Sequence, residues 1–215
     1  MQLARAAFAA LAAVMITFSP DHSAAIGMSV FSGWAIATAI VFLLSIWLVY
    51  PAGRRWPSVL LGILTIVAGM VGGVATLRTT TAFFVVVIAW AILAGIVETV
   101  AGARTRRALR GSDDLQARGE ARDGVVVGII TILLGLALLL VPTQYALDYY
   151  IEDAHRSFTL TGITIGVGIY GAYAAIVAVY LAIAAFSPRA STTAPAADDA
   201  LAESAPTSPD QGGAA

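Results

Sequence analysis

The sequence contains no cysteine and no lysine among its 215 residues, and only 12% of the residues are charged. The absence of cysteine excludes disulfides, thiolate zinc sites and cysteine-ligated iron–sulfur clusters. A soluble domain carries about 25% charged residues. Because 59% of this chain is hydrophobic, it has too few charges to build a surface that faces water on all sides. The composition therefore predicts a protein whose surface mostly faces lipid.

Long apolar runs take the place of the missing charge. A bilayer core of about 30 Å requires about 20 apolar residues per helix. Six segments approach this length, and we predict them as transmembrane helices: 3–19, 26–50, 59–77, 82–103, 125–141 and 158–186. The expected fold class is an all-α integral membrane protein, with its six short helices in residues 1–186. Residues 187–215 are rich in Ala, Pro, Ser, Thr and Asp, which predicts a disordered tail.

Arginine positions predict the orientation. If six helices cross the membrane, ten of the arginines fall on the side that holds both termini, and only Arg78 and Arg156 fall on the other. The positive-inside rule then predicts cytoplasmic termini, including the tail. The exclusive use of arginine is typical of a GC-rich bacterial genome. We therefore expect a multi-pass protein of a bacterial inner membrane.

A repeat organises the apolar segments. The octet "GILTIVAG" at 62–69 returns as "GIITILLG" at 128–135. The helices that follow share a small residue, an aromatic residue and alanine. This pattern occurs three times: "GWAIATA" at 33–39, "AWAILAG" at 89–95 and "AYAAIVA" at 172–178. The sequence thus predicts three repeated hairpins of two helices each.

The first apolar segment has two interpretations. Arg5, the short apolar run and "HSAA" at 22–25 are typical of a signal peptide with a cleavage site. However, aligning Pro20 with Pro142 puts Ala6 and Ala13 at the positions of the two octet glycines. The segment is then a degenerate copy of the repeated first helix. This interpretation favours a retained transmembrane span over a cleaved signal peptide.

Glycines at the ends of the octets indicate close helix packing. Residues seven apart lie on one face of a helix, and small residues on such a face let membrane helices approach closely. The predicted packing residues are Gly62, Gly69, Gly128 and Gly135. Their partner is either another helix of the same chain or a second copy in a homo-oligomer. Beyond the lipid bilayer, the sequence identifies no protein partner and no nucleic acid.

One ionisable residue falls deep inside a predicted span. Glu98 lies about two turns before Arg104 in the fourth segment. Ionisable residues within membranes often mark proton or ion pathways. Glu98 is therefore either a proton-carrying or gating carboxylate, or a carboxylate paired with Arg104 or with an arginine of another helix.

The predicted outer loops contain a second group of titratable residues. They are His22, Asp148, Glu152, Asp153 and His155. Histidine changes charge in mild acid and carboxylates do so at lower pH, so this group forms either a pH-sensitive surface or a simply solvated loop. We expect no metal site and no cofactor. No motif for a phosphate loop, a zinc protease or a serine hydrolase is present, and we expect the protein not to be an enzyme.

Two segments resemble a known family. "RWPSVLLGILTIVAG" at 55–69 and "TAFFVVVIAWAILAGIVETVAGARTRR" at 81–107, together with short turns and arginines after the second helices, are similar to the HdeD family of small bacterial membrane proteins. The resemblance implies a non-enzymatic role in acid or envelope stress tolerance, without assigned catalytic residues. The repeat also permits an alternative, a small-solute transporter or channel.

Overall fold

The computed structural model describes residues 1–48, 55–112, 114–152 and 155–187. The predicted tail from residue 188 onward and Asp153 lie outside these ranges. Within them the chain forms six α-helices, one 3-10 turn and one β-hairpin. The elements are α1 (Gln2–Thr17), α2 (Ala24–Leu48), α3 (Trp56–Gly73), η2 (Ala75–Leu77), α4 (Thr80–Ala108), α5 (Leu115–Leu139), β1 (Ala146–Ile151), β2 (Arg156–Thr161) and α6 (Gly162–Phe186).

The helical membrane fold predicted from composition is confirmed. Five of the described helices, α2 to α6, are long and apolar enough to cross a bilayer. The first helix, α1, is apolar but has only 16 residues. At 1.5 Å per residue it rises about 24 Å, less than the hydrocarbon core of about 30 Å. The structure therefore has five helices of spanning length and one shorter apolar helix, α1, among the described residues.

The polar stretch before α5 is more helical than its composition implied. We expected a loop over 104–123 and a helix from residue 125, whereas α4 continues to Ala108 and α5 begins at Leu115. Asp114 caps α5 by accepting a hydrogen bond from the backbone N–H of Ala117 at 2.9 Å. An aspartate at this position satisfies a free helix N–H. The helix therefore starts two to three turns before its apolar part.

The expected outer loop before α6 is a β-hairpin instead. β1 and β2 pair antiparallel, with Tyr149 opposite Phe158 and Asp148 opposite Thr159. Aromatic and β-branched residues at alternating positions favour strands. The length of apolar runs, from which the helices were predicted, does not reveal this alternation. The last strand passes directly into α6, which therefore begins at Gly162 and not at 158. Thr161 caps this start by accepting from Thr164 N–H.

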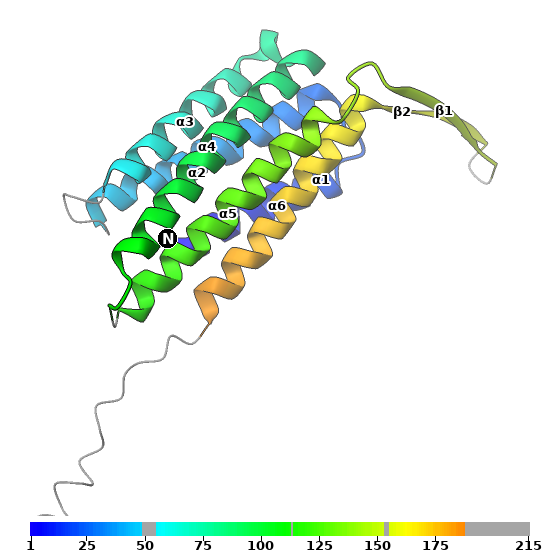
Figure 1. Ribbon diagram of the computed structural model, residues 1–215. Helices are drawn as coiled ribbons and strands as arrows, with labels where there is room; N and C mark the ends of the chain where they lie inside the picture. The colour runs from blue at the N-terminus through cyan, green and yellow to red at the C-terminus, as the bar shows by residue number, and fades with distance from the viewer. Residues whose placement is uncertain (49–54, 113, 153–154, 188–215) are drawn as a thin grey trace, which may run out of the picture.

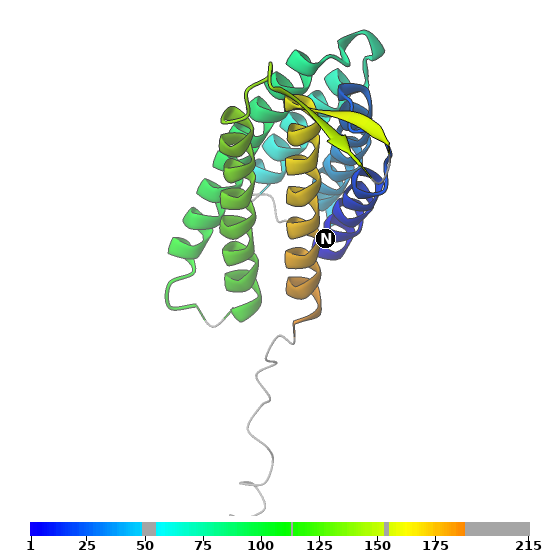
Figure 2. The same cartoon turned by 90° about the vertical axis from the view of Figure 1, so that its right-hand side faces the viewer.

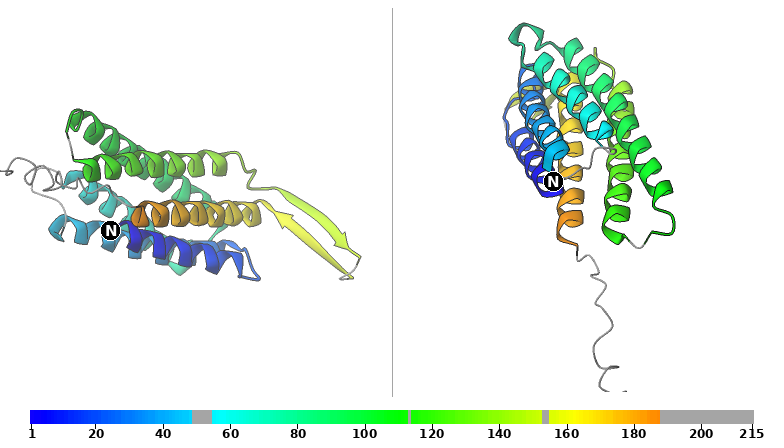
Figure 3. Two further views of the ribbon diagram at one scale, coloured as in Figure 1. Left: turned by 90° about the horizontal axis from the view of Figure 1, so that it is seen from below. Right: turned by 90° about the vertical axis from the view of Figure 1, so that its left-hand side faces the viewer.

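The helices form a ring in which the two helices of each predicted hairpin are in contact, but the closest packing joins one hairpin to the next. The most extensive contacts join α2 with α3, α4 with α5, and α1 with α6, while the helices within each repeat pack less extensively. Figures 1 and 2 show α1 lying beside α6, which closes the ring. The chain begins at the same end of the bundle at which α6 ends, and the hairpin projects from the opposite end (Figure 3). All six helices can thus contribute side chains to one interior.

Candidate functional site

Three aromatic side chains from the repeated second helices meet inside the ring. Trp34 of α2, Trp90 of α4 and Tyr173 of α6 occupy the same position in their repeats. The Trp34 and Trp90 ring centroids are 5.0 Å apart, and Tyr173 lies 6.2 Å from Trp34 and 6.3 Å from Trp90. All three are buried. We call this group the aromatic triad, and its edge-to-face packing fills the centre of the bundle.

Threonines of the octets hold two members of the triad. Trp90 Nε1 donates to Thr65 Oγ1 at 3.1 Å. Tyr173 Oη lies 3.0 Å from Thr131 Oγ1, and because Thr131 donates its own proton to the Val127 carbonyl, Tyr173 is the donor. Thr65 and Thr131 stand at the same position of the two octets. The repeat therefore encodes a hydrogen bond as well as a packing surface.

The first repeat lacks this hydrogen bond. The alignment that sets Ala6 and Ala13 against the octet glycines puts Ala9 where the threonines stand. Trp34 Nε1 is buried and has no hydrogen-bond partner among the described residues, and the same is true of Thr38 Oγ1 one turn further along α2. An unpaired buried N–H is costly. Helix α2 thus carries two of the five buried side-chain atoms that lack a partner among the described residues; the others are Arg78 Nε, Thr99 Oγ1 and Tyr170 Oη.

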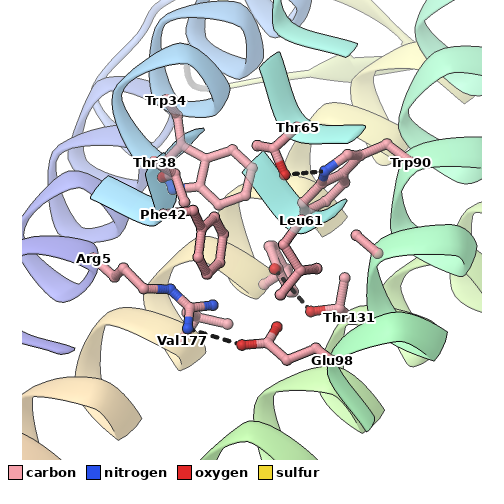
Figure 4. Close-up of a pocket in the computed structure, with 12 residues that line it drawn as sticks. Arg5, Trp34, Thr38, Phe42, Leu61, Thr65, Trp90, Glu98, Thr131 and Val177 are labelled. Atoms are coloured by element: carbon pink, nitrogen blue, oxygen red, sulfur yellow. Dashed lines mark hydrogen bonds and ion pairs between the residues drawn. The ribbon is translucent and has the colours of Figure 1, made fainter. Parts of the chain in front are cut away.

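A small cavity lies next to the triad. Its volume is about 20 Å³, which is room for about one water molecule. Trp34, Thr38, Trp90, Arg5 and Glu98 are among the residues that line it, as Figure 4 shows. We call it the central cavity. It combines polar groups of all six helices with the aromatic rings.

An ion pair between two distant helices borders this cavity. Arg5 Nη1 of α1 lies 2.8 Å from Glu98 Oε1 of α4, and the two side chains are only 17% and 10% exposed. The Arg5 guanidinium carbon also lies 4.6 Å from the centre of the Phe42 ring, close enough for a cation–π interaction. Glu98 is thus paired with an arginine of another helix. Arg104, the other partner we considered, lies over the Trp56 ring at 5.9 Å.

The ion pair occupies positions that are apolar in the other repeats. Arg5 precedes the first aligned residue of its octet, where the other two octets have Leu61 and Val127. Glu98 follows the aromatic residue by eight positions, where the other second helices have Phe42 and Leu181. The sequence did not mark Arg5 as the partner of Glu98, because Arg5 lies in the most degenerate repeat. The signal in the sequence that identifies Arg5 is a charged residue at a repeat position that is otherwise apolar.

A wider cavity opens on the far side of the ion pair. It has a volume of about 720 Å³ and is lined by all six helices at the arginine-rich end of the bundle. We call it the vestibule. Arg5, Phe42, Leu61 and Glu98 line both the vestibule and the central cavity. The ion pair therefore lies where the two spaces meet.

Acidic groups dominate the vestibule. Among its described lining residues the carboxylates are Glu98, Asp114, Glu120 and Asp123, and the basic groups are Arg5 and the amino group of Met1. Asp123 accepts hydrogen bonds from Gln2 Nε2 at 2.6 Å and from Tyr180 Oη at 3.0 Å. Both donors are neutral, so these bonds fix the carboxylate without cancelling its charge.

The four octet glycines lie between helices of the same chain. A methyl group on Gly69 would meet Ile36 Cγ1 of α2 at 2.9 Å, and one on Gly135 would meet Ile92 Cδ1 of α4 at 2.8 Å. Gly62 likewise faces α2, and Gly128 faces α4. All four are buried. These glycines let each first helix approach the second helix of the preceding repeat.

The predicted pH-sensitive residues are found at the opposite end, away from the ion pair. His22 is half-buried in the α1–α2 turn, whereas Asp148, Glu152 and His155 are exposed on the hairpin. Asp148 Oδ1 accepts from Thr159 Oγ1 at 2.5 Å across the two strands. The fifth residue, Asp153, lies outside the described ranges. Within those ranges, no three His, Asp or Glu side chains are arranged to hold a metal ion.

Comparison with known proteins adds no identity to this arrangement. No family model, no curated protein and no solved structure matches the chain. The function proposed next therefore rests on the arrangement of the side chains described above.

Proposed function

We propose that the protein is a non-enzymatic transporter or channel for a small polar solute, which passes through the interior of the bundle. The observation that carries this proposal is the Arg5–Glu98 ion pair at the junction of the vestibule and the central cavity. In this proposal the ion pair is the inner barrier. The aromatic triad, which fills the bundle beyond the central cavity, is the outer one.

The energetic cost of the ion pair supports a functional role. A charged side chain within a membrane span is costly, and a buried ion pair rarely stabilises a fold more than apolar residues of similar volume. The equivalent positions of the other repeats hold Leu61 and Phe42. Because apolar residues fit these positions, packing alone does not require Arg5 and Glu98.

The proposed orientation has the vestibule facing the cytoplasm of a bacterial cell. The vestibule lies at the end of the bundle that holds most of the arginines, and positive residues favour the cytoplasmic side. The described structure then corresponds to a state that is open to the cytoplasm and closed toward the outside.

Liposome flux tests the proposal. The purified protein is reconstituted and the entry of small polar solutes and ions is compared with that in protein-free liposomes. We expect solute to enter faster than in protein-free liposomes. In the Glu98→Gln variant we expect this rate of entry to differ several-fold from that of wild type. The matched control is Asp148→Asn, which removes a carboxylate from the exposed hairpin and leaves the rate unchanged. Wild-type entry no faster than in protein-free liposomes would contradict the proposal.

A second function, acid or envelope stress tolerance of the HdeD type, is supported by the outer hairpin. This hairpin projects from the bundle and exposes two carboxylates and an imidazole, those of Asp148, Glu152 and His155. Deleting the gene should lower survival in acid, and wild type should restore it. Equal survival of both strains, under conditions where the protein is expressed, argues against this function.

A further inference from the structure

Glu98 of α4 and Phe42 of α2 both contact the Arg5 guanidinium. Glu98 supplies a carboxylate oxygen at 2.8 Å, and Phe42 supplies a ring whose centre is 4.6 Å from the guanidinium carbon. We call Glu98 and Phe42 the cation seat. A carboxylate beside an aromatic face is a combination that recognises organic cations. Figure 4 shows Arg5 reaching to Glu98 with Phe42 beside it.

We infer that the cation seat is a binding site for a small organic cation of the guanidinium or ammonium class, and that Arg5 is a built-in occupant which the ligand displaces. This inference rests on the proposed function, because it names the class of solute that reaches the inner barrier. In the described state Arg5 fills the seat. Arriving cations compete with it for Glu98.

Charge in the vestibule favours cations over anions on the way to the seat. Four carboxylates line it, against Arg5 and the amino terminus. A cavity lined by one sign of charge raises the local concentration of the opposite sign. Since Gln2 and Tyr180 hold Asp123 with neutral donors, its negative charge adds to this field. The excess of two carboxylates over basic groups in the described lining favours the approach of cations over anions.

The position of Arg5 makes it a displaceable occupant. It lies in the first turn of α1, where its backbone N–H bonds to the Met1 carbonyl. The buried face of α1 consists mostly of alanines, Ala6, Ala9, Ala12 and Ala13, so the helix packs closely against α6 while the longer Arg5 side chain extends from its first turn. A long arginine side chain on such an end can swing toward the vestibule, which is lined by the same residue. The space it leaves has the size of a guanidinium group.

The sizes of the two cavities agree with entry from the vestibule. At about 720 Å³ the vestibule holds a hydrated organic cation, whereas the central cavity, at about 20 Å³, does not. A ligand must therefore stop at the seat until Arg5 moves. This makes Arg5 an autoinhibitory group, and its removal should expose the seat.

Chemical rescue tests the inference. The full-length protein in detergent is titrated with millimolar guanidinium chloride, and its thermal unfolding midpoint is recorded. Urea, which has a similar shape but no charge, and sodium chloride serve as ligand controls. We expect Arg5→Ala to be stabilised in a saturable manner by guanidinium and not by either control. The apparent affinity should be roughly tenfold or more above that of wild type, because the seat is no longer occupied.

Further variants keep the test decisive. Arg5→Ala combined with Glu98→Gln should lose the guanidinium effect, and Arg5→Ala combined with Phe42→Leu should weaken it. If Arg5→Ala does not fold, Arg5→Gln replaces it, since this neutral side chain retains much of the length. Guanidinium shifting the midpoint of the folded Arg5 variant no more than urea or sodium chloride would overturn the inference.

The outcomes also separate this inference from the proposed function. Guanidinium binding by the Arg5 variant without any flux in liposomes upholds the cation seat and contradicts transport. Flux of a neutral or anionic solute without guanidinium binding upholds transport and overturns the cation seat.

Discussion

Trp90 on α4 donates its indole N–H to Thr65 on α3 at 3.1 Å, and the same pairing recurs one repeat later between Tyr173 and Thr131. The α3–α4 and α5–α6 hairpins are therefore built alike. The remaining hairpin has Ala9 in place of the threonine and leaves Trp34 Nε1 without a partner among the described residues. That hairpin also contributes Arg5. The residues that depart from the repeat therefore lie close to the proposed solute-binding site.

The repeated hydrogen bond predicts unequal effects of removing equivalent groups. Thr65→Val should lower the free energy of unfolding by about 1–3 kcal/mol, because it leaves the buried Trp90 N–H unpaired. Trp34→Phe should cost less than Trp90→Phe, since Trp34 loses volume but no hydrogen bond. Thermal unfolding in detergent measures these differences. Equal costs for the two tryptophan variants would show that the Thr65 bond contributes nothing.

The octet glycines predict a position-dependent response to alanine. A methyl group on Gly128 would meet the Thr99 backbone nitrogen at 2.6 Å and the Gly95 carbonyl oxygen at 2.8 Å. Backbone cannot move aside as a side chain can, so Gly128→Ala should cost at least about 1–3 kcal/mol. The matched control is Gly33→Ala, where nothing lies within 4 Å. It should be neutral or stabilising by up to about 1 kcal/mol, because alanine favours helix. A stable, correctly folded Gly128→Ala would contradict the packing described.

The ion pair predicts coupling between Arg5 and Glu98. Arg5→Gln and Glu98→Gln should each destabilise the protein, since each leaves one charge partly buried without its partner. The double variant should be destabilised by less than the sum, with a coupling energy of about 0.5–3 kcal/mol. Thermal unfolding of the four proteins gives this value. Asp148→Asn, which removes a carboxylate from the hairpin at the opposite end of the bundle, is the control and should show additive behaviour with Arg5→Gln.

The proposed orientation predicts which positions face outward. Because the protein has no cysteine, single cysteines can be introduced without background. An impermeant thiol reagent on intact cells should label Ser23→Cys and Ser157→Cys, at the hairpin end, and not Ser112→Cys between α4 and α5. Labelling of position 112 alone would show that the orientation is inverted and that the vestibule faces the outside.

Local sequence patterns predicted the number and the approximate limits of the helices, but they missed two features. The start of α5 lies ten residues before the predicted apolar start at 125, because a helix continues into water where its residues favour helix and Asp114 caps it. The β-hairpin at 146–161 was read as a loop. Its strands gain stability from each other, and a search for apolar runs does not detect alternating residues.

The repeat was visible in the sequence, yet the partners of its helices were not. Gly69 and Gly135 predicted close packing, and the structure shows that their partners are Ile36 and Ile92 of the preceding repeat. Spacing along one helix identifies a face but contains no information on which helix covers it. Helices in a membrane have no hydrophobic preference among neighbours, so shape decides.

By itself the sequence determined that this is a helical membrane protein, because so few charges cannot cover a soluble fold, and that its helices recur in three copies. It also marked Glu98 as an acid inside a span. Only the tertiary structure decided that Arg5 is its partner, that Trp34, Trp90 and Tyr173 meet, and that a vestibule leads to them. The physical reason is that the apolar period of a chain is a local property. The Arg5–Glu98 contact joins α1 to α4, and the packing of α1 against both α2 and α6 gives α1 its place in the ring.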